Sequence, residues 1–189
     1  MHTQNFVRTA AAVVGVLLVL GLGGCAADKV DKLAQVTATP TTAPGWEGVK
    51  NVSRAGRFTF AGQPTEAAID QFASAGGAMV IDIRTHQGSD KPGFDERARV
   101  ETLGMKYVNI PITAASLSRA DVEKFAQLAR ETQGPILLHC ASSNRVGGLW
   151  AAYLAIDDGV PTKDALAAGK SAGLRSEDVE AATLRVIGR

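Results

Sequence analysis

The stretch ILLHCASSNR, residues 136–145, decides how the rest of the chain is interpreted. It opens with three apolar residues, which predict a short buried strand. A polar segment follows, and apolar residues at helical spacing begin at Val146. Cys140 therefore lies in a short loop between a strand and a helix, and Arg145 closes that loop. A buried structural cysteine suits the inside of a strand, so this placement favours a functional thiol.

This loop has the composition of an anion-binding site. Free backbone N–H groups at the start of a helix can converge on an anion and stabilise a thiolate. The planar guanidinium of Arg145 can hold two oxygens of a phosphate or a sulfur oxyanion. The donors we expect to orient the loop and bind the oxyanion are those of Ala141, Ser142, Ser143 and Asn144. The loop thus predicts a nucleophile, Cys140, aimed at a bound oxyanion.

Strands alternate with helices on either side of this loop. The patterns predict strands at about 58–60, 78–83, 106–111 and 136–139, and helices at about 65–75, 95–102, 118–133, 146–154, 163–170 and 176–186. Such alternation is typical of a single α/β domain with a mainly parallel central sheet flanked by helices. Ligands of such sheets bind beyond the carboxyl ends of the strands, where Cys140 is expected.

Composition limits the partners of the chain. Its 189 residues are 46% hydrophobic and 21% charged, which is ordinary for one globular domain. The formal net charge of +1 gives no reason to expect nucleic acid as a partner. We expect a monomer that acts on a small phosphorylated or sulfur-bearing substrate.

The N-terminus predicts export. Residues 1–24 have a positive start, a short apolar run at 10–20 and small residues before a cut site, as secretory signal peptides do. LGGC, residues 22–25, resembles a bacterial lipobox, which predicts lipidation of Cys25 and a membrane anchor. Ala26 after the cysteine favours the periplasmic side of the outer membrane. An ordinary cleaved signal and an uncleaved anchor are the alternatives.

A tether should separate the lipid from the domain. Residues 25–48 are poor in apolar residues and contain prolines, so they predict a disordered tether, and the domain is expected at 49–189. With Cys25 acylated, Cys140 is the one free thiol of the mature chain and no internal disulfide can form.

Four segments resemble a known family in their order along the chain. They are FAGQPT at 60–65, VIDIR at 80–84, YVNIPI at 107–112 and HC…RVG at 139–147. Together they resemble the protein tyrosine phosphatase superfamily, most closely the small phosphatase-like domain of bacterial beta-lactamase hydrolase-like proteins. The resemblance covers about 58–152 and implies a phosphatase-like fold and hydrolysis of a phosphate ester through a cysteinyl intermediate. It implies nucleophilic Cys140, oxyanion binding by Arg145 and a ring hydrogen bond of His139 that orients the loop.

Two departures from that family keep other functions open. Typical phosphatases place five residues between Cys and Arg, but here 141–144 are four, the loop length of rhodanese-type sulfurtransferases. Dual-specificity phosphatases usually carry an acidic residue after IPI, but here Thr-Ala-Ala stands at 113–115. Without a general acid, the rate should fall by roughly 10²–10⁴-fold. A persulfide sulfurtransferase and a non-catalytic module that binds an oxyanion or a phosphorylated partner are therefore the alternatives.

Other polar residues near the strand ends have less certain roles. Asp82, Asp90 and Asp95 are candidate substitutes for the missing acid, although Asp82 fits better as a strand-end residue bonded to nearby backbone. Arg84 ends a strand at the ligand-binding edge, so it is a candidate substrate contact or a solvated charge. His86 has no partner at metal-ligand spacing, so we expect no metal and no cofactor.

Overall fold

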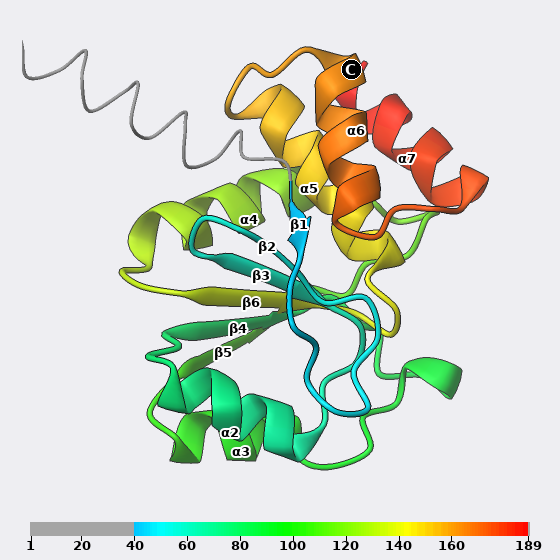
Figure 1. Cartoon of the computed structure of the whole chain (residues 1–189). Coiled ribbons are helices and arrows are strands. Elements are labelled where there is room, and N and C mark those ends of the chain that lie inside the picture. Colours follow the sequence, from blue (N-terminus) through cyan, green and yellow to red (C-terminus); the bar gives the residue numbers. More distant parts are fainter. Residues whose placement is uncertain (1–39, 189) are drawn as a thin grey trace, which may run out of the picture.

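The strand before the cysteine, β6 (Ile136–His139), lies inside a six-stranded sheet of order β1-β2-β3-β6-β4-β5 (Figure 1). The computed structural model describes residues 40–188. Strands β3 (Phe58–Ala61) and β4 (Met79–Asp82) flank β6 and run parallel to it. Strand β5 (Lys106–Asn109) runs parallel to β4 on its other side. All four residues of β6 are buried, as the apolar run predicted.

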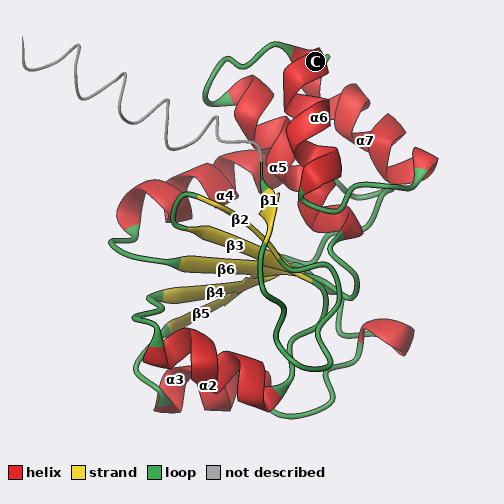
Figure 2. Ribbon diagram, in the orientation of Figure 1, coloured by secondary structure: helices red, strands yellow, loops and turns green. Residues whose placement is uncertain are grey.

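Helices cover both faces of this sheet (Figure 2). They are α2 (Glu66–Ser74), α3 (Glu96–Thr102), α4 (Arg119–Glu131), α5 (Asn144–Ile156), α6 (Thr162–Ser171) and α7 (Glu177–Ile187), with a 3-10 turn η1 (Gly88–Asp90). Helices α2 and α3 lie on one face, whereas α4 and α5 lie on the other with α6 and α7 packed beyond them (Figures 1 and 2). The predicted fold class, a mainly parallel α/β sheet flanked by helices, is confirmed, and each predicted element matches an observed one.

Two apolar clusters form the core, one on each face of the sheet. The larger cluster centres on Trp150 of α5, whose ring centroid lies 5.0 Å from that of Phe58 and 4.8 Å from that of Phe60. Burial of aromatic side chains of this size is a major stabilising contribution to a domain core. The helix that follows the cysteine is therefore fixed firmly to the sheet.

Glycines let α5 approach α6 closely. A Cβ placed on Gly147 would lie 2.3 Å from the carbonyl oxygen of Gly169 and 2.4 Å from the backbone nitrogen of Leu174. On the next residue, Gly148, a Cβ would meet Val179 at 2.6 Å. This close packing brings the C-terminal helices against the helix that follows the cysteine loop.

The predicted tether is wrong for its last nine residues, 40–48. Two short antiparallel strands, β1 (Thr41–Thr42) and β2 (Ser53–Ala55), extend the sheet beyond β3. Trp46 is buried against Phe72 of α2, with ring centroids 6.2 Å apart. Burying this indole draws the segment onto the domain, an effect that the proline-rich composition does not reveal.

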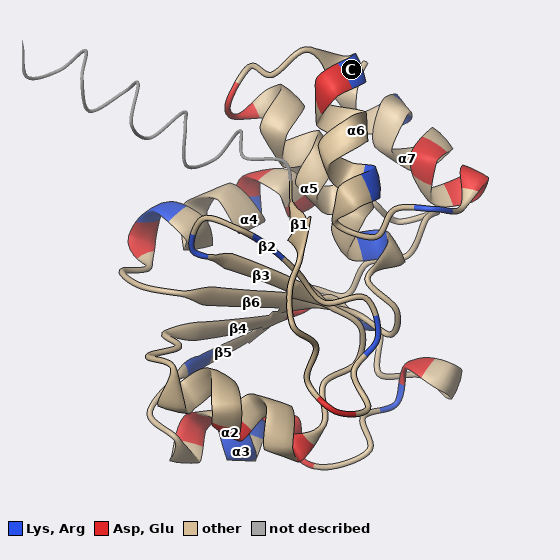
Figure 3. Cartoon of the chain, viewed as in Figure 1, with Lys and Arg blue, Asp and Glu red and all other residues tan. Residues whose placement is uncertain are grey.

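The predicted signal peptide (1–24) and lipidated Cys25 lie outside the described residues. Within residues 40–188, no helix is both long and apolar enough to cross a bilayer. Charged residues of both signs lie on the helices and loops, whereas the central strands carry few (Figure 3).

Candidate active site

Cys140 lies where β6 ends, at the carboxyl edge of the parallel strands. The residue is fully buried, and its Sγ accepts a hydrogen bond from the backbone N–H of Ser142 at 3.5 Å. Helix α5 begins at Asn144, and the amide groups of its first turn have no acceptor within the helix. Of the residues predicted to surround an oxyanion, 141–145, Ser142 therefore contacts the thiol through its amide, and Arg145 interacts with it through its guanidinium.

Backbone strain at Ser143 shapes the loop. This residue has φ of +66°, a left-handed conformation that is uncommon for a side chain other than glycine. Its hydroxyl donates to the carbonyl oxygen of Ala172 at 2.7 Å, and a Cβ on Gly173 would lie 2.8 Å from that of Ser143. Residues 172–173, which follow α6, therefore contact the turn at Ser143, and the Ser143 hydroxyl faces the protein interior.

The side chain of Asn144 also serves the loop structure. Its Oδ1 accepts from the backbone N–H of Arg175 at 2.9 Å and of Ser176 at 3.2 Å. Its Nδ2 donates to the hydroxyl of Ser176 at 2.6 Å. Asn144 thus orients the loop through its side chain, which leaves its backbone amide as the group that can face an oxyanion.

The guanidinium of Arg145, which has five N–H groups, interacts with Asp90, with the backbone of Ile112 and with the thiol of Cys140. Its Nη1 donates to Oδ2 of Asp90 at 2.7 Å and to the carbonyl oxygen of Ile112 at 2.9 Å, and its Nη2 donates to Oδ1 of Asp90 at 2.6 Å. The other edge, Nε and the second Nη2 hydrogen, is turned away from Asp90, and the guanidinium also interacts with Cys140. Burial disfavours the charge, but Asp90 and the thiol raise the pKa of Arg145. This second edge is the one that can receive an oxyanion.

Asp90, one of the candidate acids named from the sequence, lies beside Arg145, a location that the sequence did not reveal. It lies in η1, accepts from the backbone and hydroxyl of Thr85, and lines a pocket of about 380 Å³ beside Arg145. The hydrogen bond from Arg145 lowers the pKa of Asp90 to about 2. A carboxylate that remains ionised at neutral pH cannot donate the proton that a leaving group needs.

The other acid candidates do not fill that role. Asp95 is exposed and caps α3 by accepting from the backbone of Ala98 at 3.1 Å. Thr113 and Ser116 exchange hydrogen bonds in a tight turn at the position where a phosphatase acid is expected. Asp178 of α7 borders the same pocket as Arg145, and its hydrogen bond from Ser176 lowers its pKa.

Arg84 belongs to a buried ion network and not to the surface. Its side chain is fully buried, donates to both carboxylate oxygens of Asp82 at 2.9 and 2.8 Å, and also pairs with Glu96 of α3. Burial favours the neutral form of Asp82, but Arg84 and neighbouring groups hold the pKa of that carboxyl well below its usual range. The predicted substrate contact of Arg84 is wrong, because the sheet and α3 enclose the guanidinium.

Asp82 also departs from its prediction. It does accept from the backbone N–H of Arg84 at 2.9 Å, as expected for a strand-end residue. Most of its partners are side chains, however, since it also accepts from Tyr107 at 2.8 Å and lies 2.7 Å from Nε2 of His86. These partners come from positions 4 to 25 residues away, so local spacing does not reveal them.

His139 does not orient the loop through a ring hydrogen bond as predicted. Its ring is fully buried, with Nε2 2.7 Å from Oε1 of Glu96, but neither ring nitrogen has a hydrogen bond among the described residues. Its backbone fixes the strand end instead, because the N–H of Ile83 donates to the carbonyl of His139 at 3.0 Å.

A cluster beneath the loop has the residue types of a metal site. Within residues 40–188, the ligand atoms of Asp82, Glu96 and His139 lie within 4.8 Å of one another. The guanidinium of Arg84 already lies between the two carboxylates. The positive charge that these carboxylates require is therefore supplied by an arginine.

The N-terminal segment packs against the outer side of the loop. Asn51, with φ of +54°, donates from Nδ2 to the carbonyl of Ser142 at 2.9 Å, and Arg175 donates to the same oxygen at 3.0 Å. The backbone N–H of Gln63 donates to the carbonyl of Ala141 at 3.2 Å. The sequence did not reveal these hydrogen bonds to the cysteine loop, because their donors lie 33 to 91 residues away along the chain. The only local signal was the glycine and proline at 62 and 64, which are typical of a turn.

Comparison with known protein families assigns the chain to one of them. The model of the PTP-NADK family, described as a DSP-PTPase phosphatase fused to NAD+ kinase, matches residues 26–184. The chain belongs to this family. PTP-NADK proteins are members of the protein tyrosine phosphatase superfamily, and the predicted resemblance is confirmed.

Curated relatives of this PTP-NADK chain are bacterial beta-lactamase hydrolase-like proteins. The protein from Agrobacterium fabrum is 30% identical and that from Xylella fastidiosa 29% identical, each over 119 residues and 62% of this chain. The chain spans 28% of the length of these relatives. The similarity therefore concerns one part of those proteins.

Solved structures share the fold. A putative phosphatase (DUF442) from Shewanella putrefaciens has a TM-score of 0.60 at 22% identity, covering 74% of this chain and 93% of its own. A putative phosphatase from Neisseria meningitidis has a TM-score of 0.58 at 25% identity, covering 69% and 93%. A variant of P. aeruginosa TpbA in complex with pTyr has a TM-score of 0.61 at 19% identity, covering 79% and 89%. The PTP-NADK chain thus has a phosphatase-type fold.

Proposed function

We propose that the chain is a Cys-dependent phosphatase that hydrolyses a phosphate monoester. The observation that carries this proposal is the convergence at the end of β6 of the Cys140 thiol, the amide of Ser142 and the guanidinium of Arg145. Family membership and the phosphatase-type fold support the same chemistry. Helix N-terminal amides and an arginine stabilise both a thiolate and the phosphate that it attacks.

The reaction would proceed in two displacements at phosphorus. First, Sγ of Cys140 forms a bond to phosphorus, and the bond from phosphorus to the ester oxygen breaks with its electron pair on the leaving group. Then water attacks phosphorus, the P–S bond breaks, and inorganic phosphate and the thiolate are released. Arg145 would hold two phosphate oxygens during both steps and so stabilise the charge that develops on them.

The proposed chemistry lacks a proton donor in its first step. Asp90 and Asp178 are the carboxylates that border the pocket beside Arg145, and the pKa of each lies below its ordinary value. Leaving groups that are stable as anions need no proton. We therefore expect aryl phosphates to be hydrolysed in preference to alkyl phosphates such as phosphoserine.

A side-by-side assay tests this function against the sulfurtransferase alternative. The purified domain is given p-nitrophenyl phosphate in one reaction and thiosulfate with cyanide in another, with Cys140→Ser as the blank for both. We expect release of phosphate from the aryl ester that the variant lacks. Thiocyanate production without phosphate release would instead support the persulfide chemistry that the four-residue spacing allows. If neither thiocyanate nor phosphate is released, the result would support a non-catalytic binding module.

We further propose that the protein is an exported lipoprotein, anchored through Cys25 and facing the periplasm. The support is the apolar run at 10–20 and the lipobox-like residues 22–25. The described domain starts at residue 40, so about 14 residues would link the lipid to it. We propose that the anchored domain acts there as a monomer on a small phosphorylated substrate.

A further inference from the structure

The outer rim of the cysteine loop carries a lysine whose backbone is fixed in place. The carbonyl of Lys50 accepts from the N–H of Gly62 at 2.8 Å, and the next residue, Asn51, bonds to the carbonyl of Ser142. A Cβ on Gly62 would lie 3.0 Å from that Lys50 oxygen, so glycine permits this close approach. The position of Lys50 is thereby tied to the cysteine loop itself.

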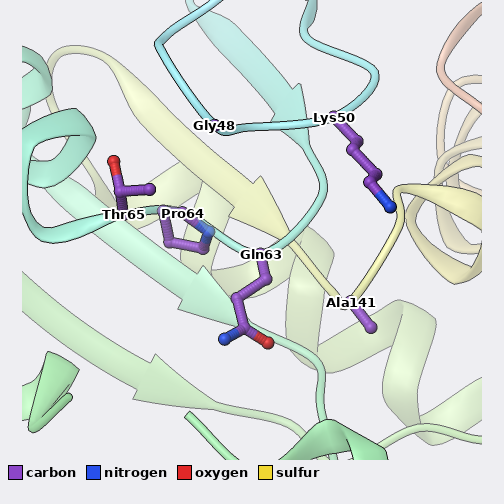
Figure 4. A pocket seen from close by; sticks show the side chains of 6 residues that line it. All are labelled: Gly48, Lys50, Gln63, Pro64, Thr65 and Ala141. Carbon is purple, nitrogen blue, oxygen red and sulfur yellow. The ribbon is translucent and has the colours of Figure 1, made fainter. Parts of the chain in front are cut away.

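This lysine borders a pocket that shares a wall with the loop. The pocket has a volume of about 280 Å³ and is lined by Gly48, Lys50, Gln63, Pro64, Thr65 and Ala141 (Figure 4). Figure 4 shows the Lys50 side chain extending from its own loop toward the segment that carries Ala141. Complete small-ligand sites measure roughly 300–1,000 Å³, so this pocket suits one substituent of a substrate.

Charge distinguishes this pocket from the one beside Arg145. Within residues 40–188, no ion pair or hydrogen bond engages the Lys50 ammonium, and the pocket has no acidic lining residue. The other pocket contains two carboxylates, Asp90 and Asp178, and the charge of Arg145 is largely taken up by Asp90. An anionic substituent is therefore attracted to the Lys50 side of the loop and repelled on the other side.

We propose that the pocket of Lys50 and Gln63 is a subsite for a second anionic group on the substrate. This inference rests on the proposed function and defines its substrate class: a small soluble phosphate monoester whose leaving group carries a carboxylate or a second phosphate. The reacting phosphate occupies the loop over Cys140. The second anion pairs with the Lys50 ammonium, which has no acidic neighbour in the pocket lining.

Matched aryl phosphates test the subsite. The values of kcat/KM are measured for 3-carboxyphenyl and 4-carboxyphenyl phosphate and for their uncharged carbamoyl counterparts of similar size. Because a carboxylate withdraws electrons less than a carbamoyl group, each value is divided by the one expected for its leaving-group pKa from a series of uncharged aryl phosphates, and these corrected values are compared. We expect the wild type to prefer at least one carboxylated ester by roughly fivefold at low salt, the upper range for one exposed ion pair. The preference should shrink as salt screens the charges.

Variants of Lys50 test whether this residue causes the preference for carboxylated esters. Lys50→Gln should abolish it and Lys50→Arg should keep it. Lys106→Gln removes an exposed lysine at the opposite, amino-terminal edge of the sheet and should leave the preference unchanged. The inference is overturned if the corrected values of the wild type are equal for both members of each pair, or if Lys50→Gln retains the preference; in both cases the proposed phosphatase function stands.

Binding to Cys140→Ser separates this inference from the proposed function. If the wild type hydrolyses none of these esters, the proposed function fails, and calorimetric affinities of the same compounds decide the subsite without turnover. Tighter binding of the carboxylated esters that Lys50→Gln removes would support the subsite. Equal affinities for charged and uncharged esters would refute it.

Discussion

Arg145 illustrates how one side chain can serve structure and chemistry together. One end of its guanidinium is held by Asp90 and by the carbonyl of Ile112, which fixes the plane of the group. The guanidinium, held in this way, also interacts with Cys140. Such preorganisation reduces the entropy lost when an oxyanion binds. Asp90 is therefore best understood as a positioning residue.

Asp90→Asn tests that role against general acid catalysis. If Asp90 only positions Arg145, the variant should lose roughly 10- to 100-fold in kcat/KM, the range for a charged hydrogen bond, for all aryl phosphates alike. If Asp90 donated a proton, the loss would grow with the basicity of the leaving group. A series from nitrophenyl to phenyl phosphate measures the difference. A loss that is much larger for phenyl phosphate would contradict the positioning role.

The buried network under the loop gives a prediction for stability. Arg84→Met leaves Asp82 and Glu96 buried without their cation, which should cost about 3–5 kcal/mol in the free energy of unfolding. The exposed Arg130, paired with Asp157, is the control, and its change to Met should cost less than about 1 kcal/mol. Urea unfolding at pH 7 measures both. Equal losses of unfolding free energy for Arg84→Met and Arg130→Met would show that the buried network contributes little to stability.

The same network predicts how stability depends on pH. The pKa of Asp82 is lowered in the folded state, against the opposing effect of burial, so its stabilisation is present above the unfolded value of about 4 and declines below it. The stability difference between wild type and Arg84→Met should therefore be largest near neutral pH and shrink as the pH falls below about 4. If the stability difference between wild type and Arg84→Met grew as the pH fell, the conclusion that Asp82 is ionised in the folded state would be contradicted.

At the scale of elements, the contact of α5 with α6 connects packing to the site. A Cβ on Gly147 would meet backbone atoms of Gly169 and Leu174, which cannot move aside alone. Gly147→Ala should therefore destabilise the fold by roughly 1–3 kcal/mol, as overpacking does. Gly45→Ala is the control, because nothing lies within 4 Å of its added Cβ. A shift of the urea midpoint for Gly45→Ala as large as that for Gly147→Ala would contradict this explanation.

The elements were predictable where local periodicity determines them. Strand β6 was placed with its observed bounds, and α4, which begins with a capping box of Ser118 and Asp121, was placed close to its observed start. β1 and β2 were missed because they are two and three residues long and depend on pairing partners for their conformation. The site followed the same rule: the cysteine loop is contiguous and was found, whereas the pairing of Asp90 with Arg145 spans 55 residues.

At the scale of the whole molecule, the proposed lipid anchor would determine where the domain acts. It depends on Cys25, which lies outside the described residues. Cys25→Ala should release the protein from membranes or stop its processing, whereas Cys140→Ser should leave its location unchanged. Fractionation of cells that express the full chain measures this. A processed Cys25→Ala protein that stays with the membrane fraction would refute lipidation.

The central claim is that Cys140 forms a covalent bond to phosphorus during turnover. Intact mass spectrometry after rapid acid quench, with an aryl phosphate as substrate, tests it most directly. We predict a phosphoryl group on the wild-type protein, located at Cys140 by peptide mapping and absent from Cys140→Ser. The same measurement after thiosulfate treatment is the comparison. A wild-type protein that gains a sulfur atom from thiosulfate but never a phosphoryl group during ester turnover would contradict the account.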